Sequence, residues 1–205
     1  MNILLLSEHY SPKISGTVSY VKHLLNGLPD DSVNIYFVRP SKGIVGEYHL
    51  EYDSTSEIYF LNLGVIESKE PEYSPLERNE LCKFIERDLS TLVEKYKIEV
   101  VHLLYGFFLA EILDTSFLRS RGIKSLFTVH NIPPEECSIS WKGDLFWRKW
   151  KDDIRKLGVQ AINHKRLKKQ RFDIYIVPSI YVKSRLNKIL PNAEISVIPH
   201  GGAEL

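Results

Sequence analysis

The chain has 205 residues, of which 43% are hydrophobic, 11% aromatic and 26% charged, a globular composition long enough for one large domain. It contains no apolar run of about 18 residues, so no membrane-spanning helix is predicted, and no signal peptide is indicated before the first apolar run. Cys82 and Cys137 are the only cysteines, and they indicate neither a disulfide framework nor a zinc site.

Charge is distributed unevenly along the chain. The net charge is +1, but residues 141–171 carry eleven Lys and Arg against three Asp, a local net of +8. The remaining residues carry a net of −7. This asymmetry predicts a surface that meets an anionic partner.

The first predicted element is a strand at the start of the chain. Residues Asn2–Ser7 are apolar without alternation, which is typical of a strand buried on both faces of a parallel sheet. A polar loop follows, and apolar residues at helical spacing then predict a helix beginning near Thr17. The turn between them would lie beyond the carboxyl end of the strand, where open α/β sheets bind ligands.

Strands and helices alternate through the rest of the chain. Six further strands are predicted at 33–38, 57–63, 98–104, 123–129, 173–177 and 194–198, and 41–56 is predicted as a loop or hairpin. Helices are predicted from near 75 to 97, at 108–120, within 141–170 and at 179–190. The expected fold is α/β, a Rossmann-like, doubly wound, mainly parallel seven-stranded sheet with helices on both faces.

The turn Ser15-Gly16-Thr17 is the first candidate binding site. Its backbone N–H groups could approach a phosphate, but a glycine before a helix is more often a simple cap. The chain contains neither G-x-G-x-x-G nor a P-loop motif, so the turn does not indicate an ordinary dinucleotide fold or a P-loop enzyme.

Other candidates follow later strands of the predicted sheet. His130 and Asn131 could hydrogen-bond a sugar hydroxyl or a phosphate, although loop backbone could equally satisfy the histidine. Tyr105-Gly106 ends the fourth strand, and Ser179, most simply a helix N-cap, follows the sixth. Because these strand ends converge on one crevice, their combination is a stronger signal than any single residue.

An aromatic and basic segment is the remaining candidate surface. Trp141, Trp147 and Trp150 are the three tryptophans of the chain, and Lys149 is one of the basic residues among them. This mixture suits the interface of an anionic membrane, a partner chain or a nucleic-acid backbone. The alternative is that the tryptophans pack into the core while the lysines stay in water. No Asp-x-Asp metal motif occurs, so no metal site is predicted.

Taken together, the chain resembles the N-terminal domain of family-4 retaining glycosyltransferases, which have the two-domain GT-B fold. The resemblance lies in the order and spacing of NILLLSEHYSPKISGTVSYVKHL, VVHLLYG, LFTVHNIPP, FDIYIVPS and ISVIPHGG. It implies that Gly16 matches the second glycine of a turn that lies against the donor diphosphate and the acceptor. Ser15 stands where a glycine is usual. The resemblance also implies that His130 contacts the donor sugar.

The resemblance further implies a division of labour between two domains. Residues 1–198 would form the acceptor-side domain and 199–205 the start of an interdomain hinge, while the C-terminal donor domain is absent from this sequence. That domain would act in cis or as a separate chain. The donor would be a nucleoside-diphosphate sugar and the acceptor a glycan, a lipid-linked sugar or a small molecule. No cofactor and no nucleic acid are expected.

Two other functions stay open at this point. The chain could be a non-catalytic binding or scaffold subunit that docks a membrane or a partner, or half of a GT-B sugar-nucleotide epimerase. The cytoplasm is the expected compartment, with a peripheral position at the inner face of the cell membrane as the variant that the aromatic and basic segment favours. Alone, the chain is expected to show no transferase turnover.

Overall fold

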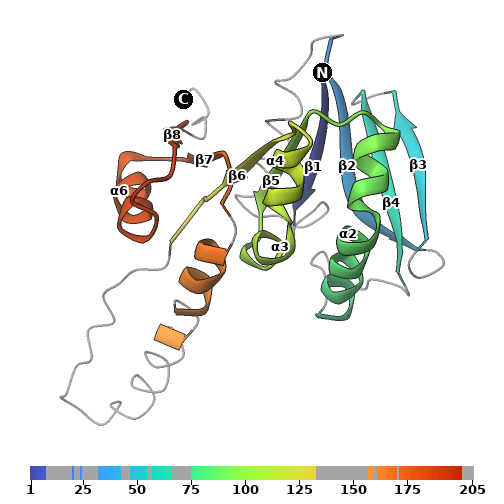
Figure 1. The fold of residues 1–205 in the computed structure, drawn as a ribbon. Coiled ribbons are helices and arrows are strands. Elements are labelled where there is room, and N and C mark those ends of the chain that lie inside the picture. Colours follow the sequence, from blue (N-terminus) through green and yellow to red (C-terminus); the bar gives the residue numbers. More distant parts are fainter. Residues whose placement is uncertain are drawn as a thin grey trace, which may run out of the picture.

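The computed structural model describes residues 1–7, 20, 24, 32–42, 47–54, 57–65, 75–132, 157–158, 161–169 and 171–199. These residues form one eight-stranded sheet with helices packed against it (Figure 1). The strands are β1 (Asn2–Ser7), β2 (Asn34–Lys42), β3 (Tyr48–Asp53), β4 (Ile58–Val65), β5 (Val100–Tyr105), β6 (Lys124–Thr128), β7 (Ile174–Val177) and β8 (Ile195–Val197). The helices with assigned bounds are α2 (Pro75–Lys95), α3 (Phe107–Ile112), α4 (Thr115–Ser120) and α6 (Ile180–Ile189).

The sheet is parallel except at one edge, which confirms the predicted α/β class. The strand order is β3-β4-β2-β1-β5-β6-β7-β8, and only the β3–β4 pair is antiparallel. After β1 the chain first builds the sheet outward through β2 and β4, then returns to the other side of β1 with β5. In such sheets the ligand crevice opens at this reversal, outside the carboxyl ends of the two central strands. Here those strands are β1 and β5.

The predicted number of seven strands is wrong by one, because β3 was placed in a loop or hairpin. This strand pairs with β4 from Tyr48↔Leu63 to Asp53↔Ile58. Its four central residues are exposed, so the strand has no buried face to produce an alternating sequence pattern. Its sequence also carries charges, as edge strands often do. Contacts with the sheet hold it, including a Tyr52–Tyr59 ring pair at 4.8 Å.

The single helix predicted over 108–120 is two short helices. Asp114 caps α4 by accepting hydrogen bonds from the backbone N–H groups of Ser116 and Phe117, both at 3.0 Å. Leu113 just before it has extended backbone angles and is buried. The apolar spacing runs on across the break, so periodicity alone predicted one helix, whereas the cap residue divides it.

Side chains alternate between two buried faces of the sheet. On β1, Leu4 and Leu6 join the larger core together with residues of α2, α3, α4 and α6. Ile3 and Leu5 join a smaller cluster on the other face, against which Tyr20 and Leu24 pack. Both of these residues are helical, so helical residues contact each face of the sheet. Burial on both faces explains why β1 reads as a continuous apolar run.

Among the described residues, no helix is long and apolar enough to cross a membrane.

Candidate functional site

The carboxyl ends of β1, β5 and β6 bring the site residues together. Ser7, at the end of β1, is 2% exposed and is the register partner of Tyr105 at the end of β5. His130 follows the end of β6, which pairs with β5. The rings of Tyr105 and His130 lie 6.0 Å apart between centroids. The structure therefore brings the predicted residues His130 and Tyr105 to the same edge, next to the reversal of strand order.

The His130 ring is held by contacts from neighbouring elements. Its Nε2 lies 2.9 Å from the carbonyl oxygen of Leu104. Because a carbonyl oxygen only accepts, this nitrogen carries the proton and donates to it. The ring of Tyr20 meets the His130 ring edge to face, with centroids 4.8 Å apart and planes at 81°. The orientation of His130 is thus set by the backbone of β5 and by two tyrosine rings.

Two buried polar residues lie behind this ring, and sequence reasoning missed both of them as site residues. His102 Nε2 and Thr128 Oγ1 are 2.8 Å apart, and the two residues are 7% and 1% exposed. Burial, together with the smaller effect of the nearby His130, lowers the pKa of His102 to about 4, so His102 is neutral at pH 7. The only signal available in the sequence was a histidine inside an apolar strand, VVHLLY.

Thr128 also hydrogen-bonds the side chain of Tyr20. Burial raises the pKa of Tyr20, and the hydrogen bond with Thr128 only partly opposes this shift, so the phenol stays protonated at neutral pH. Tyr20 thereby links the buried pair to the His130 ring. It belongs to the helix predicted after the first strand, but the sequence analysis did not single it out.

Gly106 has a backbone conformation that explains why a glycine stands at this position. Its φ is 129° and its ψ is 108°, a region that side-chain-bearing residues rarely adopt. It precedes α3 and supplies no side-chain cap. The Tyr105-Gly106 turn therefore needs glycine for its shape, and the predicted contact of Gly106 with substrate stays a prediction.

The segment after β6 is fastened to α6. Arg185, which is 7% exposed, donates from Nη1 to the carbonyl oxygen of Ile132 at 3.0 Å. Ile132 is itself buried, whereas Asn131 beside it is exposed. The exposed Asn131 side chain is thus held between His130 and an anchored residue. Sequence reasoning missed Arg185, because nothing in the sequence distinguishes it from a surface arginine of an amphipathic helix.

Ser179 caps α6, as one interpretation of the sequence predicted. Its Oγ accepts a hydrogen bond from the backbone N–H of Val182 at 3.3 Å. This accounts structurally for a serine after β7. Contact between Ser179 and a substrate remains a prediction, and so does that of Asn131.

Two groups of predicted residues lie outside the described part of the chain. They are the turn residues Ser15, Gly16 and Thr17, and the aromatic and basic residues Trp141, Trp147, Lys149 and Trp150.

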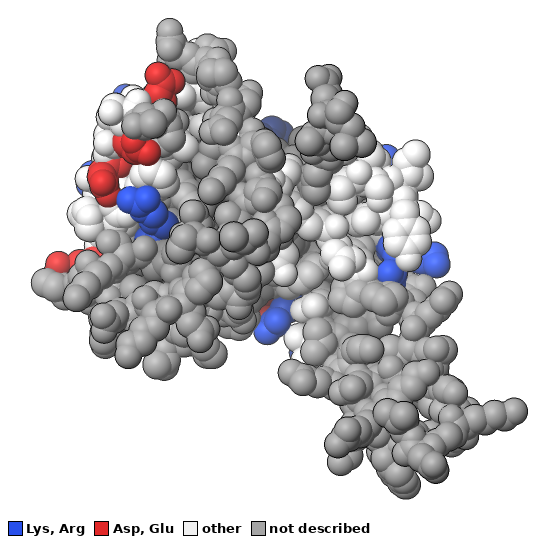
Figure 2. Space-filling view, turned by 180° about the vertical axis from the view of Figure 1, so that it is seen from behind, with Lys and Arg blue, Asp and Glu red and all other residues white. Residues whose placement is uncertain are grey.

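The described part of the basic segment is partly neutralised. Arg166 Nε and Lys169 Nζ lie 2.9 and 3.5 Å from the carboxylate of Glu111. Burial alone would raise the pKa of Glu111, but these two cations lower it below its ordinary value. On the face seen in Figure 2, acidic side chains gather at the edge formed by β3, and the described basic side chains are scattered. The described residues on that face therefore form no continuous basic surface.

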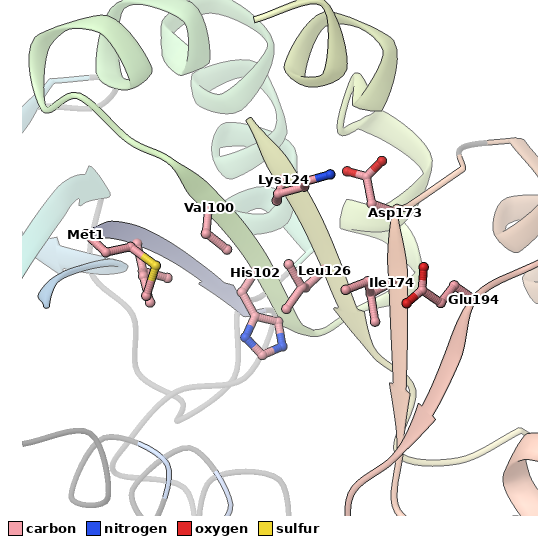
Figure 3. A pocket seen from close by; sticks show the side chains of 9 residues that line it. Met1, Val100, His102, Lys124, Leu126, Asp173, Ile174 and Glu194 are labelled. Atoms are coloured by element: carbon pink, nitrogen blue, oxygen red, sulfur yellow. The ribbon is translucent and has the colours of Figure 1, made fainter. Parts of the chain in front are cut away.

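A cavity of about 470 Å³ lies at the opposite, amino-terminal edge of the sheet (Figure 3). The strands β5, β6 and β7 contribute their first residues to its lining. Its lining residues are Met1, Ile3, Val100, His102, Lys124, Leu126, Asp173, Ile174 and Glu194.

Of the two acids that line this cavity, Asp173 has structural partners. Asp173 accepts from the backbone N–H and the hydroxyl of Ser125, both at 2.8 Å, and pairs with Arg119 at 3.3 Å. Within the described residues, no group of three His, Cys, Asp or Glu side chains is placed to hold a metal ion. Open α/β sheets bind ligands at the carboxyl ends of their strands, so the edge around His130 is the better candidate site.

Solved structures share this fold at low sequence identity. Sucrose-phosphate synthase from Thermosynechococcus elongatus matches 97% of this chain and 47% of its own, with 18% identity and a TM-score of 0.61. An α,α-trehalose-phosphate synthase (UDP-forming) from Burkholderia xenovorans, solved with glucose-6-phosphate, matches 97% of this chain and 49% of its own. Its identity is 10% and its TM-score 0.56. A UGT transferase from Siraitia grosvenorii, solved with UDP, matches 97% and 51%, with 11% identity and a TM-score of 0.52.

The chain spans about half the length of each of these structures. Its fold is therefore that of one half of the GT-B architecture, and it corresponds to the N-terminal half. A comparison with curated proteins finds no match. The model of Glycosyltransferase Family 4, however, matches residues 14–201, which is most of the chain. The chain therefore belongs to glycosyltransferase family 4.

Proposed function

We propose that this chain is the acceptor-binding half of a nucleotide-sugar-dependent glycosyltransferase. The observation that carries the proposal is the position of His130 at the carboxyl edge of β6, beside the strand reversal, in a chain that matches family 4 over 14–201. Residues 1–198 form the acceptor-side domain in this proposal, and 199–205 begin the hinge.

A second half of the enzyme is proposed because this chain covers only about half of the structures that it matches. The matched structures are about twice as long as the part that this chain covers, so the donor-nucleotide pocket is assigned to a further domain. One matched structure is named as UDP-forming and another was solved with UDP, which supports a nucleoside-diphosphate sugar as donor. The acceptor in the proposal is a glycan, a lipid-linked sugar or a small molecule.

The chemistry assigned to this half is positioning of the sugar and neutralisation of the leaving group. With the Nε2 proton of His130 directed at Leu104, a sugar hydroxyl would donate to the other ring nitrogen, Nδ1. The turn at Ser15-Gly16-Thr17 would present backbone N–H groups to the donor diphosphate. Stabilisation of the departing diphosphate by such dipoles and by positive charge is a common route for group transfer.

The test compares the chain alone with the chain joined to a family-4 donor domain, covalently or as a mixture. Release of nucleoside diphosphate and formation of glycosylated acceptor are followed over a panel of nucleotide sugars. We expect transfer by the joined protein and none by the chain alone. Robust turnover by the chain alone would overturn the assignment as a half enzyme. Formation of a C2 epimer of the nucleotide sugar without transfer would replace it with epimerase function.

A further inference from the structure

Behind the candidate site lies a run of hydrogen-bonded side chains that the proposed reaction does not use. It consists of His102, Thr128 and Tyr20, referred to below as the buried polar chain. His102 Nε2 is 2.8 Å from Thr128 Oγ1, and the same hydroxyl bonds the phenol of Tyr20. Tyr20 in turn contacts the His130 ring at 4.8 Å.

The placement of these residues follows from strand geometry. His102 and Leu104 are two residues apart on β5, and Thr128 and His130 are two residues apart along the β6 segment, so each pair lies on one face of the sheet. Leu104 and Tyr20 belong to the same cluster on that face. His130 therefore contacts this cluster twice, through its hydrogen bond to Leu104 and through the Tyr20 ring.

The buried polar chain restricts how Tyr20 can be oriented. One hydroxyl donates a single hydrogen bond and accepts up to two, so the bond of Thr128 with His102 limits the bond that it makes with Tyr20. Because Thr128 is 1% exposed, breaking either bond would leave its buried hydroxyl with one partner fewer. The hydroxyl of Tyr20 thus bonds Thr128, while its ring meets the His130 ring edge to face.

We propose that His102, Thr128 and Tyr20 are positioning residues that fix the ring plane of His130, whose tautomer is set by the Leu104 carbonyl. The proposal rests on the function proposed for His130, since its purpose is to present that ring to the donor sugar. It adds residues that act through His130 rather than on the substrate. Their effect can be measured on the His130 ring itself, in the absence of substrate.

The experiment is a long-range ¹H–¹⁵N correlation spectrum of the histidine-labelled chain at pH 7.5, with His130 assigned from H130Q. In the unmodified chain we expect His130 as the Nε2–H tautomer. T128V removes the hydroxyl and keeps the branched shape, and Y20F removes the phenol hydroxyl and keeps the ring. Both are expected to shift the His130 ring resonances, whereas T128S restores them.

The matched control is T115V, the same substitution at another threonine that is 2% exposed, located in α4. It is expected to leave the His130 resonances in place. Unchanged His130 resonances in T128V or in Y20F would overturn the proposal, as would an equal shift in T115V. If T128V fails to fold, Y20F and T128S decide the question. Since the measurement needs no substrate, its failure would leave the proposed sugar transfer standing.

Discussion

Replacing Arg185 with methionine tests how the segment that carries His130 is held in place. Methionine keeps the length of the apolar stem but removes the charge and the donors. The Arg185 guanidinium donates to the Ile132 carbonyl at 3.0 Å and lies 5.7 Å from the Tyr181 ring centroid. Loss of a hydrogen bond from a charged group costs about 1.5–3 kcal/mol, and removing a largely buried charge offsets part of this. We expect R185M to lower the free energy of unfolding by about 1–2 kcal/mol.

The matched control for R185M lies on the same helix. Lys183 Nζ donates to the Ile195 carbonyl at 2.8 Å, so K183M removes the same kind of bond, here to the first residue of β8. Urea unfolding gives the stability of each variant, and amide hydrogen exchange locates the effect. R185M should speed exchange at 130–132, and K183M should speed it around Ile195 only. Equal exchange at 130–132 in the two variants would refute the assigned role of Arg185.

Three further perturbations test other parts of the account. D114A should lower the free energy of unfolding by about 0.5–2 kcal/mol in urea, because α4 loses its cap; no change would contradict the capping assignment. Burial raises the pKa of Asp173, but the hydrogen bonds from Ser125 and Arg119 outweigh it and leave that pKa below the ordinary value. The stabilisation that ionised Asp173 contributes is therefore complete above the ordinary aspartate pKa and is lost as pH falls through the folded-state pKa. Urea unfolding from pH 6 to 3 should show that the free energy of unfolding depends less on pH in D173N than in the unmodified chain. Identical pH dependence in the two proteins would contradict this. If the aromatic and basic segment contacts an anionic membrane, W147A and K149E should each reduce co-sedimentation with anionic liposomes but not with neutral ones, and no lipid dependence in either would exclude that contact.

Sequence patterns predicted the buried parallel strands because their signal is local. A strand covered on both faces is a short apolar run, and the segments NILLLS, VVHLLY and IYIV all lie in the sheet. The edge strand β3 was not predicted as a strand, because its exposed residues carry no such signal. The break between α3 and α4 was not predicted, because buried residues on both sides keep the helical spacing and only Asp114 marks the break.

The position of the candidate site was predictable from the sequence, but the buried contacts that hold its residues in place were not. Strand ends place His130 and Tyr105 at one edge, since parallel strands share their direction. The hydrogen bonds that support them join residues far apart in the sequence: His102 and Thr128 are 26 residues apart, and Arg185 and Ile132 are 53 apart. No single-sequence pattern encodes which residues meet across such distances. The turn at Ser15-Gly16-Thr17 and the tryptophans remain predictions.

The central claim is that His130 belongs to the wall of a sugar-transfer site, and the rate of transfer by the complete enzyme tests it most directly. The comparison is between the unmodified protein, H130A and H49A, whose altered residue is exposed on β3 far along the sheet from β6. Loss of a hydrogen bond to the reacting sugar is expected to lower kcat/KM about 10- to 100-fold in H130A. H49A should retain the unmodified rate. Equal rates for H130A and H49A would contradict the account.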